Sequence, residues 1–228
     1  MMTHWMDFLP VVEIETDDSP AYAIIWLHGL GADGNDFVPI VNELELPSGA
    51  SVRFIFPHAP ERPVTINNGY VMRAWYDIAH TDFSNHQDKS GIQDSQKAVD
   101  ALIEKEMRRG IPSNRIVLAG FSQGGAMALQ AGLRQSNPLA GIIALSCYLP
   151  LAESLAAEAS SANAATPIFM AHGNYDPVVP MILAMKSKEK LLASGYSLEW
   201  HEYPMAHTVC GQEIADISDW LRHIMSAP

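Results

Sequence analysis

Short apolar runs rich in Ile, Val or Phe recur along the chain. Because these runs are continuous rather than alternating with polar residues, they are typical of strands that are buried on both faces of a sheet. The runs predict strands at 22–27, 52–56, 116–119, 141–146, 167–171 and 197–203, with 11–15 as a candidate edge strand.

Between these runs, apolar side chains recur at the three- and four-residue spacing of amphipathic helices. The pattern predicts helices at 93–109, 122–135 and 180–193, and a last one around residues 214–224. Strands that alternate with helices of this length form right-handed crossovers and a parallel sheet. We therefore expect an α/β fold, with a mostly parallel central sheet and helices on both faces. The length of 228 residues suits a single domain, 1–228.

The net charge of −12 comes from 26 acidic and 14 basic residues. A field of this sign repels phosphate backbones, so we expect no nucleic-acid partner. The longest apolar stretches, 21–27 and 141–145, are far shorter than the ~20 residues that span a bilayer, so no stable membrane insertion is expected. The N-terminal ten residues show neither the basic run nor the apolar core of an export signal, which favours a cytoplasmic protein.

Metal and disulfide chemistry are not suggested by the residue spacing. The two cysteines, Cys147 and Cys210, form no C-x-x-C pair and are expected to be free thiols. The nine histidines fall in no H-E-x-x-H motif and in no Cys/His cluster, so no metal site is predicted.

Residues 120–124 read G-x-S-x-G, with Ser122 at the centre, between an apolar segment and a helix rich in Ala and Leu. A serine on a sharp strand-to-helix turn has a strained backbone, and side chains two positions away on either side would collide there. The turn also puts Ser122 at a helix N-terminus, whose free amides can face a developing negative charge. Ser122 is therefore a candidate nucleophile, and the alternative is a turn that merely packs closely.

Two further strand ends carry side chains that suit such a serine. Asp176 follows the segment 167–171 in a proline-rich turn, and His207 follows 197–203. A carboxylate orients a histidine and stabilises its imidazolium form, and histidine shuttles protons near neutral pH. Alone, each residue is more often structural. At one end of one sheet, in the order Ser122, Asp176, His207, they predict a catalytic triad of the α/β-hydrolase order.

The loop after the segment 22–27 reads His-Gly-Leu-Gly. Acyl transfer needs donors aimed at the oxyanion, and the backbone N–H groups of Leu30 and Gln123 are the candidates. His28 is expected to brace this loop rather than to take part in the chemistry. Residues 29–34 also match G-x-G-x-x-G, but a dinucleotide site needs a carboxylate about 20 residues further on, and none ends the second strand.

Motifs spread over nearly the whole chain occur in one order: residues 28–31, 56–60, 75–77 and 120–125, then His172-Gly173 with Asp176, and Met205 with His207. Together they resemble the phospholipase/carboxylesterase family, which includes bacterial carboxylesterases and eukaryotic acyl-protein thioesterases. The resemblance implies an α/β-hydrolase fold, with Ser122 as nucleophile, His207 as general base and Asp176 as its partner. It likewise implies an oxyanion hole at Leu30 and Gln123, and it allows a homodimer. Pro204 stands where the family pattern has glycine.

The segment 61–75 is loop-like but carries apolar side chains. By the family resemblance it is a flap beside the acyl pocket, with Trp75 and Tyr76 near the pocket wall. The alternative is that these two are plain core aromatics. The candidate substrate-binding residues are therefore Trp75, Tyr76, Val71 and Met72.

The sequence thus predicts a serine carboxylesterase that hydrolyses small-molecule esters of short- to medium-chain acids through an acyl-enzyme on Ser122, without cofactor or metal. The acidic surface and the lack of a lid helix favour soluble esters over bulk lipid. One alternative is an acyl-protein thioesterase or lysophospholipase that acts on longer acyl chains. Another is a catalytically silent binding protein that keeps the hydrolase fold.

Overall fold

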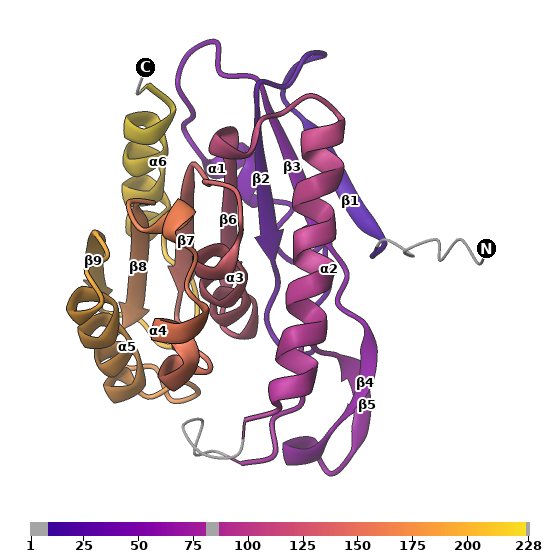
Figure 1. The fold of residues 1–228 in the computed structure, drawn as a ribbon, viewed down its shortest axis with the longest axis vertical. Coiled ribbons are helices and arrows are strands. Elements are labelled where there is room, and N and C mark those ends of the chain that lie inside the picture. The colour runs from indigo at the N-terminus through magenta and orange to yellow at the C-terminus, as the bar shows by residue number, and fades with distance from the viewer. Residues whose placement is uncertain (1–8, 81–86, 227–228) are drawn as a thin grey trace.

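The computed structural model describes residues 9–80 and 87–226, and within these ranges one sheet of seven strands runs through the molecule (Figure 1). The strand order is β1-β3-β2-β6-β7-β8-β9, with β1 antiparallel to β3 and the remaining neighbours parallel. The strands are β1 (Val11–Glu15), β2 (Tyr22–Leu27), β3 (Val52–Pro57), β6 (Ile116–Phe121), β7 (Gly141–Leu145), β8 (Ile168–Gly173) and β9 (Leu198–Tyr203). Each coincides, to within two residues at either end, with a strand expected from the apolar runs.

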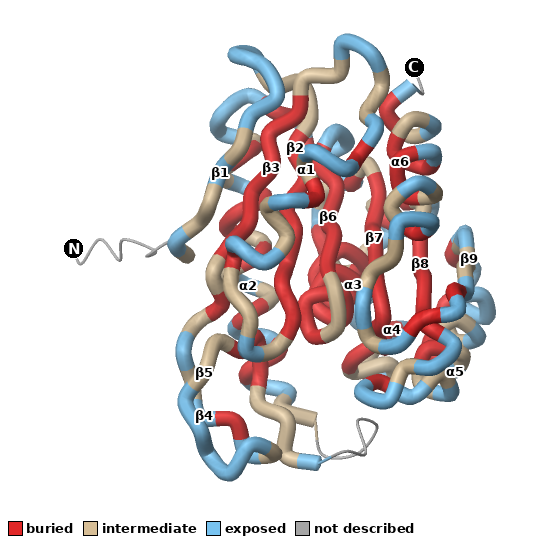
Figure 2. The backbone as a smooth tube through the Cα atoms, turned by 180° about the vertical axis from the view of Figure 1, so that it is seen from behind, coloured by how far each residue is buried: buried red, intermediate tan, exposed pale blue. Residues whose placement is uncertain are grey.

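Helices cover both faces of this sheet, as the alternation of strands and helices predicts. Side chains of β2 divide between two apolar clusters, because successive residues of a strand point to opposite faces. The inner strands β3, β2, β6, β7 and β8 therefore appear buried along most of their length in Figure 2, whereas the edge strands β1 and β9 are partly exposed. The elements on one face are α2 (Lys89–Arg108), α3 (Gln123–Arg134), α4 (Leu155–Glu158) and α5 (Met181–Ala193), and those on the other are α1 (Ile40–Glu43) and α6 (Gly211–Ser226).

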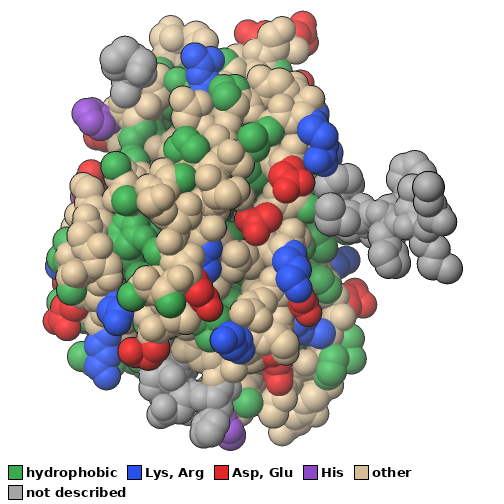
Figure 3. Space-filling model, viewed as in Figure 1, with side chains coloured by type: hydrophobic (Ala, Val, Ile, Leu, Met, Phe, Trp, Pro, Cys, Tyr) green, Lys and Arg blue, Asp and Glu red, His purple; other side chains and the backbone are tan. Residues whose placement is uncertain are grey.

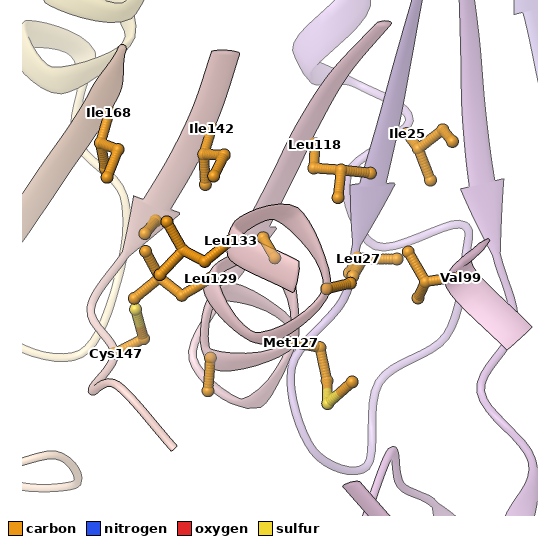
Figure 4. Packing of buried hydrophobic residues seen from close by; sticks show 14 of the residues in the cluster. Ile25, Leu27, Val99, Leu118, Met127, Leu129, Leu133, Ile142, Cys147 and Ile168 are labelled. Atoms are coloured by element: carbon orange, nitrogen blue, oxygen red, sulfur yellow. The ribbon is translucent and has the colours of Figure 1, made fainter. Parts of the chain in front are cut away.

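Helix α3 lies at the centre of its face. Leu118 of β6 and Ile142 of β7 point toward Leu129 and Leu133 of the helix (Figure 4). A Cβ atom on Gly132 would lie 2.5 Å from Cδ1 of Ile142, so the helix approaches the sheet as closely as glycine allows. This packing fixes the position of α3 and therefore of the turn from which it starts.

Two elements differ from the expectation. Helix α2 begins at Lys89 rather than at 93, because the Asp88 carboxylate caps it by accepting a hydrogen bond from the Gly91 N–H at 2.9 Å. Part of the loop-like segment 61–75 forms an antiparallel hairpin of β4 (Glu61–Val64) and β5 (Tyr70–Arg73). Its strands are short and largely exposed, so they lack the apolar runs by which the other strands are recognised.

The loops after the parallel strands gather at one end of the sheet, toward the bottom of Figure 1, where the β4–β5 hairpin also lies. The neighbours of β2 are β3 on one side and β6 on the other, so the strand order reverses there. Ligands of open α/β sheets bind in the crevice outside the carboxyl ends of the strands at such a reversal. The turn that carries Ser122 follows β6 at this position.

The surface carries charges of both signs. On the face shown in Figure 3, acidic and basic side chains are interspersed rather than segregated. Across the described ranges, no helix combines the length and the apolar character that crossing a membrane requires.

Candidate active site

Ser122 occupies the turn between β6 and α3 in a strained conformation, with φ 55° and ψ −121°. A residue with a side chain held in such a region costs about 1–3 kcal/mol, so the surrounding structure must enforce it. The Ser122 N–H donates to the carbonyl of Leu145 at the end of β7 at 2.8 Å, and the buried helix α3 starts directly afterwards. Both sides of the turn are thus anchored.

The glycines on either side of Ser122 are required by close backbone approaches. A Cβ atom on Gly120 would lie 2.3 Å from the backbone carbon of Gly124, and one on Gly124 would lie 2.2 Å from the carbonyl oxygen of Leu27. Backbone atoms cannot move aside as a flexible side chain can. The structure therefore confirms the steric reason for the G-x-S-x-G pattern.

Asp176 and His207, which follow different strands, meet directly. Oδ2 of Asp176 lies 2.6 Å from Nδ1 of His207, and because a carboxylate only accepts, this imidazole nitrogen donates. Oδ1 of Asp176 accepts the backbone N–H groups of Val178 at 2.8 Å and Val179 at 2.9 Å. The Asp176 side chain is 0% exposed and that of His207 15%. The other imidazole nitrogen of His207 remains available for proton transfer.

His207 also lies beside the Ser122 turn. Its ring centroid is 4.7 Å from that of Phe121, the residue that precedes the serine. The structure therefore places the turn of Ser122 beside the His207–Asp176 pair. Ser122 follows β6 and Asp176 follows β8, and β7 lies between these two strands in the sheet. A serine turn beside a histidine that is hydrogen-bonded to a buried carboxylate provides the parts of a nucleophilic acyl-transfer site.

The two backbone amides expected to face an oxyanion flank the same serine. A Cβ atom on Gly29 would lie 3.5 Å from Cβ of Ser122, so the loop after β2, which contains Leu30, lies against the nucleophile. Gln123 opens α3 directly after it. Within residues 9–80 and 87–226, neither the Leu30 nor the Gln123 backbone N–H donates to another residue. Both donors are therefore free for a ligand.

His28 braces the loop after β2, in agreement with its expected role. Its Nδ1 donates to the carbonyl of Gly29 at 2.7 Å, and its Nε2 accepts the N–H of Ala59 at 3.0 Å. An imidazole that accepts on one nitrogen is neutral, and burial also lowers the pKa of His28. The ring therefore links the loops after β2 and β3.

The side chain of Gln123 has a role that the sequence did not reveal. Its Oε1 accepts the backbone N–H of Trp75 at 2.8 Å, and its Nε2 donates to the carbonyl of Tyr76 at 2.8 Å. The Trp75 indole N–H in turn donates to the carbonyl of His28 at 2.9 Å. Gln123 thus fastens the segment after β5 to the start of α3. The only signal in the sequence is one polar residue among the small and apolar residues at the start of a buried helix.

The candidate substrate-binding residues fall into two groups. Trp75 and Tyr76 are 0% and 1% exposed, and the Tyr76 hydroxyl lies 2.9 Å from that of Tyr148. Val71 of β5 is 55% exposed, whereas Met72 is half-buried, with its sulfur 3.5 Å from where a Cβ on Gly31 would lie. Met72 therefore contacts the Leu30 loop, and the two aromatics belong to the packed interior beneath it.

A groove of about 670 Å³ lies between the segment after β7 and helix α5. Leu149 and Leu183 contribute to its apolar wall, and the Leu149 N–H donates to the hydroxyl of Ser187, another lining residue, at 2.8 Å. The segment after β7 lines the groove from Tyr148 onward, three residues after Leu145, whose carbonyl accepts the Ser122 N–H. Ser122, Asp176 and His207 are not among the lining residues. Its volume falls within the ordinary range for small-molecule sites. The remaining lining residues are Gln87, Lys89, Tyr148, Leu151, Ala152, Glu153, Ser154, Lys186 and Lys190.

Comparison with known proteins agrees with this geometry. Residues 10–225 match the family model described as Phospholipase/Carboxylesterase. Acyl-protein thioesterase 1 of Cryptococcus neoformans is 38% identical over 227 residues, covering 92% of this chain and 95% of the relative. Acyl-protein thioesterase 1 of Neurospora crassa is 43% identical over 207 residues, covering 87% and 84%.

Comparison with a solved structure supports the same fold. The crystal structure of Zea mays acyl-protein thioesterase 2 superimposes with a TM-score of 0.85 at 27% identity, covering 96% of this chain and 100% of that one. The match along the sequence, the parallel sheet and the residues gathered at its carboxyl edge all agree. The chain therefore belongs to the phospholipase/carboxylesterase family of α/β-hydrolases and is an ester-hydrolysing enzyme.

Proposed function

We propose that the enzyme cleaves acyl groups through a covalent acyl-enzyme on Ser122. The observation that carries this proposal is the 2.6 Å contact of the buried Asp176 with His207, beside a serine held at a positive φ. In the proposed mechanism, His207 takes the proton of the Ser122 hydroxyl as its oxygen attacks the substrate carbonyl. Asp176 stabilises the resulting imidazolium. His207 then protonates the leaving group, and water repeats the cycle on the acyl-enzyme.

The backbone amides of Leu30 and Gln123 are proposed to bind the oxyanion of the tetrahedral intermediates. Their N–H groups have no acceptor among the described residues, and packing fixes both the loop of Leu30 and the start of α3. Donors that need no reorganisation during the reaction contribute a few kcal/mol each to transition-state stabilisation, about 3–4 kcal/mol in measured cases.

The substrate that we favour is a thioester or ester of a longer acyl chain. Two relatives that are 38% and 43% identical over most of the chain are acyl-protein thioesterases. The groove between the β7 segment and α5, with leucines on its wall, offers an apolar surface for such a chain, although none of the three catalytic candidates lines it. Hydrolysis of short- to medium-chain esters is the second candidate, since the charged surface favours soluble substrates and both reactions share one acyl-enzyme.

A chain-length series separates the two candidates. Turnover of acetyl, octanoyl and palmitoyl substrates would be compared, each as an oxygen ester and as a thioester. We expect kcat/KM to rise with chain length. Leu183→Trp, which fills the groove, should then lower palmitoyl turnover and leave acetyl turnover unchanged. The control is Leu192→Trp, at a residue of the same helix that is 49% exposed and outside the groove. A profile that is highest for acetyl substrates would favour the short-chain ester.

Labelling with a fluorophosphonate tests the nucleophile itself. Intact mass and peptide mapping should show one adduct, located on Ser122. Ser122→Ala removes a single oxygen, so it should remain folded while kcat falls by as much as about 10⁶-fold. A folded wild-type protein that takes up no label and turns over no ester would contradict the proposal and favour a silent binding protein.

A further inference from the structure

A second histidine contacts the carboxylate that holds His207. His172 lies on β8, and its side chain is 0% exposed. Its Nε2 lies 2.9 Å from the carbonyl oxygen of Val179 and 3.4 Å from Oδ2 of Asp176. Because both neighbours are acceptors, Nε2 carries the proton. Oδ2 of Asp176, which accepts from His207 at 2.6 Å, therefore faces two imidazole N–H groups.

The opposite side of the His172 ring decides which of the two histidines can become charged. Its Nδ1 is buried and has no hydrogen-bond partner among the described residues. A proton placed there would leave a charged N–H in the interior without an acceptor, which is strongly unfavourable. Burial accordingly lowers the pKa of His172, although the carboxylates of Asp176 and Glu202 oppose this effect; His207 is the remaining titratable group that acts on it.

His172 is also joined to Asp176 through the backbone. The Val179 carbonyl accepts from His172, while the Val179 N–H donates to Oδ1 of Asp176 at 2.9 Å. Val179 is thus hydrogen-bonded to both side chains, so the position of the His172 ring affects the position of the Asp176 carboxylate. The loop of His207 is held to the β8 end independently, by the N–H groups of Asn174 and Tyr175, which donate to the carbonyls of Tyr203 at 2.8 Å and Met205 at 3.0 Å.

We propose that His172 is a positioning residue: its permanently neutral ring orients the Asp176 carboxylate through Val179 and Oδ2, and it leaves the imidazolium charge of catalysis to His207. This inference rests on the acyl-enzyme mechanism proposed above. Because separate backbone hydrogen bonds hold the His207 loop, loss of His172 should disturb the orientation and charge of the carboxylate rather than the fold of the site.

A matched pair of variants tests the proposal. In His172→Gln the amide nitrogen reaches the position of Nε2 and keeps a neutral donor, whereas His172→Met has a similar length but no donor. We expect His172→Met to lose about 10- to 10²-fold in kcat, as for small misplacements of reacting groups, with KM within about twofold. The acid limb of its kcat/KM against pH should move to higher pH. Without the N–H of residue 172, the charge on Oδ2 of Asp176 acts on His207 alone and stabilises the imidazolium form of His207 more strongly. His172→Gln should keep both properties.

Several results would overturn the inference. These are an unchanged or downward-shifted acid limb in folded His172→Met, a wild-type kcat in that variant, or a His172→Gln variant that behaves like His172→Met. Should the Met variant not fold, ¹⁵N side-chain NMR of the wild type decides: His172 must remain the neutral Nε2–H tautomer between about pH 5 and 8, where ordinary histidines titrate. Absence of a Ser122 adduct in the wild type would instead refute the acyl-enzyme mechanism.

Discussion

Replacing Gln123 by methionine removes both hydrogen bonds that this side chain makes while keeping its approximate length. The Trp75 N–H and the Tyr76 carbonyl would lose their partner, and both residues are almost fully buried, at 0% and 1% exposed. Leaving one buried polar group unsatisfied costs about 1–3 kcal/mol. Two such groups predict that Gln123→Met lowers the free energy of unfolding by about 2–6 kcal/mol, a large share of the roughly 5–15 kcal/mol of a typical protein.

Urea unfolding followed by circular dichroism measures this loss, with Gln130→Met as the matched control. Gln130 lies on the same helix and is 1% exposed, but among the described residues its side chain donates to one partner, the half-buried Gln96, at 3.0 Å. Since water can replace that single bond, the control should lose less than about 1.5 kcal/mol. If Gln123→Met lost no more stability than Gln130→Met, the two buried hydrogen bonds would not fasten the segment after β5, and the reasoning would be wrong.

Two further substitutions test the turn and the pH dependence. Gly124→Ala should destabilise the protein strongly and abolish activity, because the added Cβ would lie 2.2 Å from the Leu27 carbonyl oxygen. The control is Gly211→Ala, whose Cβ would have no atom within 4 Å and which should melt at the wild-type temperature. Equal melting temperatures for the two variants would contradict the predicted clash. Burial raises the pKa of Glu213 from 4.5 to about 8, so the folded state retains a proton that the unfolded chain releases, and stability should fall as pH rises between these values. Glu213→Gln should reduce this fall in urea unfolding at about pH 5 and 8, and an undiminished fall would show that another group causes it.

Local patterns were sufficient for the fold class and for the catalytic candidates. Each buried strand is a short apolar run, and each main helix shows its own spacing, so the positions of the elements could be predicted. Ser122, Asp176 and His207 each follow a separate strand, and parallel strands end at the same edge of a sheet. Their approach in space therefore follows from their places in the sequence. The structure adds the contact between Asp176 and His207, at 2.6 Å.

The candidate substrate residues show where such patterns stop being informative. An aromatic residue in a loop-like segment suits a pocket wall as well as a core, and the sequence left both open for Trp75 and Tyr76. In the structure both are enclosed, because α2, the β7 segment and the start of α3 cover them. The hairpin of β4 and β5 was missed because its short, exposed strands pair only with each other.

Sequence alone thus determined the alternation of strands and helices, the strained serine turn and the order of the three catalytic candidates, since all of these depend on neighbouring residues. Tertiary structure decided the strand order, the groove beside α5, the Gln123 hydrogen bonds and the second imidazole at Asp176. Gln123 meets Trp75 across 48 positions of the chain. Whether a buried polar group is satisfied by so distant a partner depends on how whole elements pack, and no local pattern records that packing.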